Sequence, residues 1–191
     1  MVSRKKGHRH ATGAPGPTPS AGRAAPGDEP AIPGWPDPLP DRLRWLEKRI
    51  EQTRFSRAEV VRYWQKAVAK AGDAQLAGVS ADTALEAAYG AGRLASTAVL
   101  ATRHIRARGG QGHHEAVFGA VAALDLPGCD DILADSEEVR VARHESDYAP
   151  DFASPADLKN AVEWVRRTLP ALHAALVASD PDLEAYLVTY P

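Results

Sequence analysis

The spacing of apolar residues predicts helices along most of the chain from Asp41 onward. Steps of three and four recur, which is the period of an amphipathic helix, and the strict alternation of a half-buried strand stands out nowhere. The buried positions expected from this period are Leu43, Leu46 and Ile50 in a first helix; Val60, Trp64, Val68 and Ala71 in a second; Ala84, Ala87, Ala88, Ala91, Leu94, Ala95, Ala98, Leu100 and Ile105 in a third; Val117, Phe118, Val121 and Leu124 in a fourth; and Leu158, Val162, Val165, Leu169, Leu172 and Leu176 in the last long one. We therefore expect an all-α fold, an antiparallel helical bundle of four to five main helices without a sheet.

Capping residues predict where several of these helices begin. Ser56-Arg57-Ala58-Glu59 has the S-x-x-E form of a capping box, and Ser154-Pro155-Ala156-Asp157 combines a serine cap, a proline and an acid in the first turn. Ser80 is the expected cap of the third helix, which we predict to be central and to extend to about Arg106. A short terminal helix is expected over residues 180–190.

Composition divides the chain into two parts. Residues 1–39 are rich in Gly, Pro, Ala and Ser, which predicts a disordered tail, whereas residues 40–191 have the length of one domain. The formal net charge is -2, so any contact with nucleic acid needs a local basic patch. No apolar run reaches the roughly 20 residues of a membrane span, and no secretory signal is evident, so we expect a cytoplasmic protein.

Metal and disulfide chemistry find little support in the sequence. Cys129 is the only cysteine, which excludes an internal disulfide, and the Cys and His spacings of a zinc site do not occur. We therefore expect neither a metal nor a cofactor.

A polar stretch from Val139 to Tyr148 is the main candidate site. On a helix, Arg140, Arg143, His144 and Asp147 fall at i, i+3, i+4 and i+7 and share one face. Arginine binds phosphate oxygens through a bidentate fork, and histidine exchanges a proton near neutral pH, so the set suits phosphate chemistry. The alternative is a solvated face on which charges pair within the helix.

Two further groups of basic residues are weaker candidates. Arg106 and Arg108, with Arg103 and His104, form a basic end of the predicted third helix, where they either attract phosphate or complement the helix dipole. His113 and His114 open the next helix, and we expect a role in its first turn rather than a shared metal.

Two local patterns and their order along the chain resemble the HEPN family, the higher-eukaryote and prokaryote nucleotide-binding domains. The patterns are A-Y-x-A-x-R-L-A at residues 88–95 and R-x-x-x-D-Y at residues 143–148, separated by the G-G-Q-G-H-H turn and followed by the S-P-A-D helix start. The resemblance covers about residues 55–180 and implies an antiparallel helical bundle that forms a homodimer. Many members of the family are metal-independent ribonucleases, commonly toxins encoded beside a nucleotidyltransferase antitoxin.

The resemblance implies candidate roles for individual residues. The family motif is an arginine followed, after four to six residues, by a histidine; here only three residues separate Arg140 from His144. Transfer of the motif makes Arg140, Arg143, His144 and Asp147 catalytic, with Tyr148 as a residue that binds the substrate. We assign substrate binding also to Arg106 and Arg108, and we expect the ligand to be RNA or a nucleotide in a toxin–antitoxin or defence setting. The alternative is a non-catalytic helical module that pairs with a nucleotidyltransferase or another protein.

Overall fold

Helices make up most of the described chain. A computed structural model describes residues 41–129, 131–148 and 153–190, and only the backbone of residues 133 and 144–148. The elements are α1 (Asp41–Arg44), β1 (Ile50–Gln52), α2 (Arg57–Asp73), α3 (Ala81–Thr102), β2 (Ile105–Ala107), α4 (His113–Ala123), α5 (Ile132–Tyr148), α6 (Pro155–Ser179) and the 3-10 helix η1 (Pro181–Ala185). The all-α fold class is confirmed. The tail predicted for residues 1–39 lies outside the described residues.

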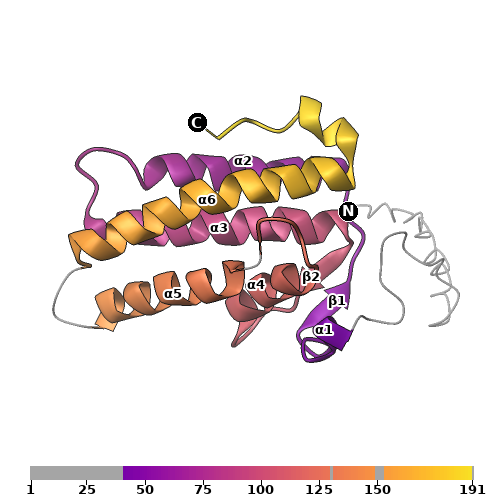
Figure 1. Cartoon of the computed structure of the whole chain (residues 1–191), viewed down its shortest axis with the longest axis horizontal. Coiled ribbons are helices and arrows are strands. Elements are labelled where there is room, and N and C mark those ends of the chain that lie inside the picture. The colour runs from indigo at the N-terminus through magenta and orange to yellow at the C-terminus, as the bar shows by residue number, and fades with distance from the viewer. Residues whose placement is uncertain (1–40, 130, 149–152, 191) are drawn as a thin grey trace, which may run out of the picture. The chain divides into compact units, whose positions relative to one another are not determined.

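The helix α3 is the centre of the bundle. It packs against α2, α6, α4 and α5, and α2 and α3 run antiparallel, as do α5 and α6 (Figure 1). Fourteen of the 22 residues of α3 are buried, and from Ala87 to Thr102 no residue is fully exposed. Within the described ranges, no helix combines the length and apolarity that crossing a membrane requires.

The predicted helix starts are confirmed. The Ser56 hydroxyl accepts the amide of Glu59 while the Glu59 carboxylate accepts the amide of Ser56, and Ser154 and Asp157 make the same reciprocal pair. Ser80 accepts the amide of Thr83 at the start of α3. These bonds satisfy amides that have no partner inside the helix, so short-range chemistry fixes these boundaries.

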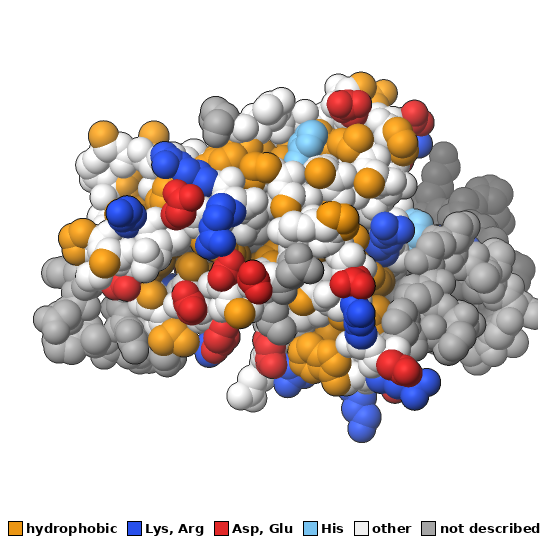
Figure 2. Space-filling model, in the orientation of Figure 1, with side chains coloured by type: hydrophobic (Ala, Val, Ile, Leu, Met, Phe, Trp, Pro, Cys, Tyr) orange, Lys and Arg blue, Asp and Glu red, His pale blue; other side chains and the backbone are white. Residues whose placement is uncertain are grey.

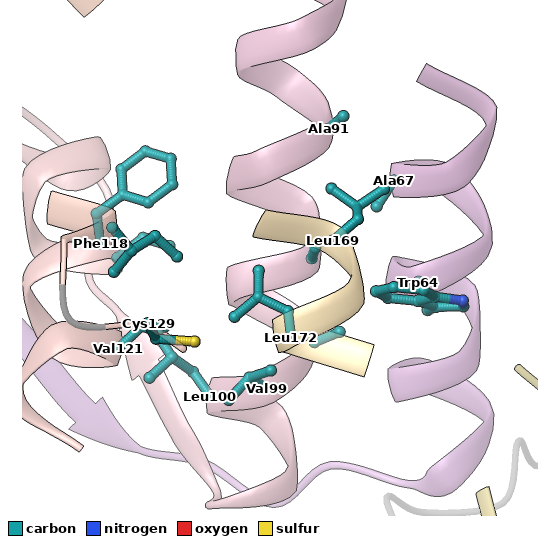
Figure 3. Close-up of a cluster of buried hydrophobic side chains, with 14 of the residues drawn as sticks. Trp64, Ala67, Ala91, Val99, Leu100, Phe118, Val121, Cys129, Leu169 and Leu172 are labelled. Carbon is teal, nitrogen blue, oxygen red and sulfur yellow. The ribbon is translucent and has the colours of Figure 1, made fainter. Parts of the chain in front are cut away.

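Large side chains from α2, α4 and α6 fill the core around the small residues of α3. Figure 3 shows Trp64 of α2 beside Leu169 and Leu172 of α6, with Phe118 and Val121 of α4 on the other side of α3. These five side chains are all almost fully buried. Cys129 is also buried.

The expectation of no sheet was wrong, because two short strands pair antiparallel. Ile50 lies opposite Ala107, and Gln52 opposite Ile105. His104 has a left-handed backbone with φ 57°, which turns the chain away from α3, and its carbonyl accepts the amide of Thr53 at 2.8 Å. Three-residue strands are too short to produce a recognisable alternation, although Ile105 and Ala107 are buried and Arg106 between them is exposed.

Several predicted helix ends also require correction. The first helix stops at Arg44 rather than reaching Ile50, and α3 stops at Thr102 rather than Arg106. The terminal helix is a single 3-10 segment that ends at Ala185. Leu94, expected on the buried stripe of α3, is only partly buried.

Gly92 of α3 determines how closely α6 approaches. A Cβ atom built on Gly92 would lie 2.1 Å from Cη2 of Trp164, a side chain that is 1% exposed. Gly90, in the same helix, is different, because its Cβ would meet only the end of the flexible Lys70 side chain at 2.9 Å. At Gly92 a buried neighbour therefore occupies the space that a side chain would need, whereas at Gly90 only a flexible side chain does.

We predict that Gly92→Ala lowers the free energy of unfolding by about 1–2 kcal/mol, since overpacking outweighs the better helix propensity of alanine. Gly90→Ala is the matched control and should be neutral or stabilising. Thermal and urea unfolding of the two variants tests this. Equal stability of both would mean that α6 does not approach α3 this closely.

Candidate functional site

A cleft of about 970 Å³ opens between the start of α4, the first half of α5 and the segment before β1. Its lining residues come from three separate parts of the chain: Arg49; the stretch from Gly110 through Glu115, which includes the start of α4; and Ala134, Glu137 and Arg140 of α5. We call it the Arg49–Arg140 cleft. It brings Arg140, predicted from the polar stretch, beside the two histidines that open α4.

The start of α4 has no side-chain cap. Its N-cap residue is Gly112, with a left-handed φ of 77°, and the Arg49 guanidinium lies against it, 3.4 Å from where a Cβ atom would be. His113 turns back, with its Nδ1 atom 3.0 Å from the carbonyl oxygen of Arg108. The positive end of the α4 dipole therefore lies at the cleft.

Two arginines line the cleft, and each is paired with a carboxylate. Arg49 donates from Nη1 to Glu115 at 2.7 Å, whereas Arg140 donates from Nε and Nη2 to both oxygens of Glu137. The bond from Arg140 lowers the pKa of Glu137, so this pair stays charged at neutral pH. A guanidinium has five N–H donors, so these bonds leave further donors on both arginines for a ligand.

His114 is a half-buried titratable group of the cleft. Burial lowers its pKa to about 4, and the positive charges of Arg93, His113, Arg143 and Arg140 act in the same direction. The imidazole is therefore neutral at pH 7 and a weak proton acceptor. It suits hydrogen bonding to a ligand better than proton transfer at neutral pH.

Tyr89 of α3 holds the two walls of the cleft together. Its buried ring lies 5.5 Å from the ring of His114 and 5.6 Å from that of Phe118, both on α4. On the other side, the guanidinium of Arg143 on α5 lies 5.6 Å from the Tyr89 ring centre. Burial raises the pKa of Tyr89 to about 12, so the ring remains neutral and suits a cation–π contact.

The structure separates the residues predicted from the polar stretch. Arg140 lines the cleft, whereas Arg143 pairs with Glu86 of α3 and thereby contributes to packing. The backbone of α5 continues helically through His144, Asp147 and Tyr148, whose side chains lie outside the described part.

The two basic candidates after α3 lie on the strand pair rather than at a helix end. Arg106 is exposed on β2, with Nε 3.9 Å from Glu51 of β1. Arg108 follows β2; its amide donates to the carbonyl of Arg49 at 2.7 Å and its Nε to that of Ile50 at 3.2 Å. Because of this bond to Arg49, Arg108 is adjacent in space to the cleft. The alternative of complementing the α3 dipole is wrong for this pair, since α3 ends before them.

Sequence reasoning missed Arg49, Glu115 and Glu137 as members of the site. Arg49 and Glu115 are 66 positions apart, so no local pattern reports their pairing. The spacing of Glu137 and Arg140 is that of an intrahelical pair and was a usable signal.

Charge is distributed unevenly over the fold. Residues 41–62 contain seven Lys and Arg against four Asp and Glu, and residues 103–108 add three arginines without an acid. Residues 125–191 instead contain 14 acidic against five basic residues. Figure 2 shows acidic side chains gathered over α5 and the adjacent edge of α6, where Asp135, Glu138, Asp157 and Glu163 line a second cleft. An anionic ligand is therefore favoured at the end of the bundle that carries β1 and β2.

Among the residues described, no group of three or more His, Cys, Asp or Glu side chains is placed to hold a metal ion. Comparison with known proteins adds no assignment: no protein-family model matches the chain, and no curated protein or solved structure is significantly similar to it. Functional assignment therefore depends on the geometry and charge of the Arg49–Arg140 cleft.

We predict that His114 makes folding sensitive to acid. An unfolded histidine binds its proton near pH 6.5, whereas the folded one does so only near pH 4, so the unfolded state binds more protons in between. The free energy of unfolding should fall as the pH drops through this window, and His114→Gln should lose this component. Urea unfolding at several pH values measures it. If the free energy of unfolding falls equally with pH in wild type and variant, the His114 imidazole is not held neutral in the folded protein.

Proposed function

We propose that the protein binds RNA or nucleotides in the Arg49–Arg140 cleft. The observation that carries the proposal is the meeting of two arginines from distant segments with the uncapped start of α4. Guanidinium groups and helix N-termini are both favourable to phosphate. The excess of basic residues in 41–62 and 103–108 favours the same end of the bundle, with Arg106 and Arg108 as exposed contacts for a longer ligand.

Membership of a HEPN-like group, assembly as a homodimer and action in a toxin–antitoxin or defence setting are parts of this proposal that rest on the sequence resemblance. Ribonuclease chemistry is a further step. It needs a proton acceptor and donor as well as charge stabilisation of the phosphorane. Arg140 is available for stabilisation, and His144 is the candidate acid and base.

The second candidate is a non-catalytic module that pairs with a nucleotidyltransferase or another protein. It is favoured by the carboxylate partners of both cleft arginines, since such pairs also occur as structural ion-pair networks. Only the first candidate predicts that RNA binding changes when a charged residue of the cleft is replaced.

We predict that Arg140→Ala weakens binding of a short single-stranded RNA by about tenfold or more, because one charged phosphate contact is lost. Glu137→Gln should strengthen binding, since it frees the Arg140 fork. Fluorescence anisotropy with a labelled RNA at fixed salt measures both changes.

Arg167→Ala is the matched control for this measurement. Arg167 pairs with Asp135 at 3.4 Å on the acidic side of α5, so its replacement removes the same charge away from the cleft. Equal losses of RNA affinity in the Arg140 and Arg167 variants would mean that the effect comes only from the net charge of the protein. No effect of Arg140→Ala would favour the protein-pairing module.

If the protein cleaves RNA, we predict that His144→Ala abolishes cleavage without changing the thermal melt, because it removes the candidate acid and base. Cleavage should continue in EDTA. A time course with purified protein and labelled RNA tests both. Cleavage that persists in the His144 variant would remove this residue from the mechanism.

A further inference from the structure

Trp45 is the exposed aromatic side chain nearest to the cleft along the chain. Its side chain is 51% exposed, although its indole ring is anchored on one side. A Cβ atom built on Gly119 of α4 would lie 2.8 Å from both Cζ2 and Cη2 of Trp45, so the benzene edge of the indole rests on the helix where no side chain intervenes. The ring is thereby held in place while much of its surface stays open.

The segment from Arg42 to Arg49 lies along α4. Arg49 contacts Gly112 and Glu115 at the start of that helix, Trp45 contacts Gly119, and Arg42 pairs with Asp125 just beyond its end at 2.7 Å. Seven residues separate Gly112 from Gly119, which is about 10 Å along a helix. Trp45 thus lies beyond the reach of a single phosphate group held in the cleft.

Basic side chains lie near Trp45. Arg42, Arg44, Lys48 and Arg49 are within four residues of it. Three of them are ion-paired, Arg42 with Asp125, Arg44 with Asp41 and Arg49 with Glu115, and each guanidinium keeps further N–H donors for a phosphate. Figure 2 shows hydrophobic surface with both basic and acidic side chains around it over α1 and the segment that follows it. An aromatic face beside basic side chains is the arrangement by which proteins bind single-stranded nucleic acid, with a base on the ring and phosphates on the cations.

We infer that Trp45 is a stacking platform for a base of a single-stranded RNA whose phosphate backbone enters the Arg49–Arg140 cleft. This inference rests on the proposed function and specifies its ligand as an oligonucleotide rather than a mononucleotide. The strand runs along α4, with Arg49 between the stacked base and the cleft. Trp45 thus favours an oligonucleotide over a mononucleotide, and it takes no part in chemistry at phosphorus.

The test compares two probes, a single-stranded RNA hexamer and AMP, on the full chain. Trp45→Leu should lower the affinity for the hexamer by about 5- to 150-fold, the loss expected for one stacked base, and leave the affinity for AMP unchanged. Trp45→Phe, which keeps an aromatic face, should retain most of the hexamer affinity. In a Trp35→Phe background, quenching of tryptophan fluorescence by the hexamer should decrease in Trp45→Phe, since the two remaining tryptophans, Trp64 and Trp164, are buried.

Two outcomes would overturn the inference. One is unchanged hexamer affinity in Trp45→Leu while Arg140→Ala weakens binding, which leaves the proposed function intact. The other is an equal loss for the hexamer and AMP, which would mean that Trp45 only shapes the cleft. Failure of the wild-type chain to bind either probe would instead refute the proposed function, and this inference with it.

Discussion

The close approach of α6 to α3 is the constraint on which the rest of the fold depends. Trp164 lies where any side chain at Gly92 would be, and the alanines of α3 let α2 and α6 pack near its backbone. Packing of this kind weakens with separation, because a gap of about 0.5–1 Å already removes roughly a quarter to a half of the dispersion energy of a contact. With α2 and α6 on one side of α3, the opposite side is left for α4 and α5.

The cleft is a consequence of how α4 and α5 are attached to that opposite side. Both helices contact Tyr89, α4 through His114 and Phe118, and α5 through Arg143. A residue of the central helix therefore sets the spacing of the two walls. This explains why Arg143, which shares a helix with Arg140, contributes to the site without lining it: it positions α5 so that Arg140 faces the start of α4.

Local chemistry made much of the fold predictable, and distant pairing made the rest unpredictable. The capping boxes at Ser56 and Ser154 and the apolar spacing of α6 are short-range signals. Both boxes form as predicted, and four of the six apolar positions predicted for α6 are buried, Val165, Leu169, Leu172 and Leu176. The pairing of β1 with β2 depends on residues more than fifty positions apart and on the left-handed turn at His104. The candidate site divides in the same way. Arg140 was predicted from its helix, whereas its proximity to Arg49 and His114 arises only from tertiary packing.

The ion pairs of the cleft bear on which chemistry it can perform. Arg140 and Glu137 are held as a charged pair, and burial keeps His114 neutral, so the cleft has donors for phosphate while its buried imidazole does not carry a proton at pH 7. Binding requires only the donors. Catalysis requires, in addition, a group that gains and loses a proton during the reaction. The carboxylate partner of each arginine occupies part of its guanidinium, so a phosphate meets only the N–H donors that remain. The proposed binding of a phosphate backbone at this cleft would therefore need only these donors, whereas cleavage would depend on a proton carrier other than His114.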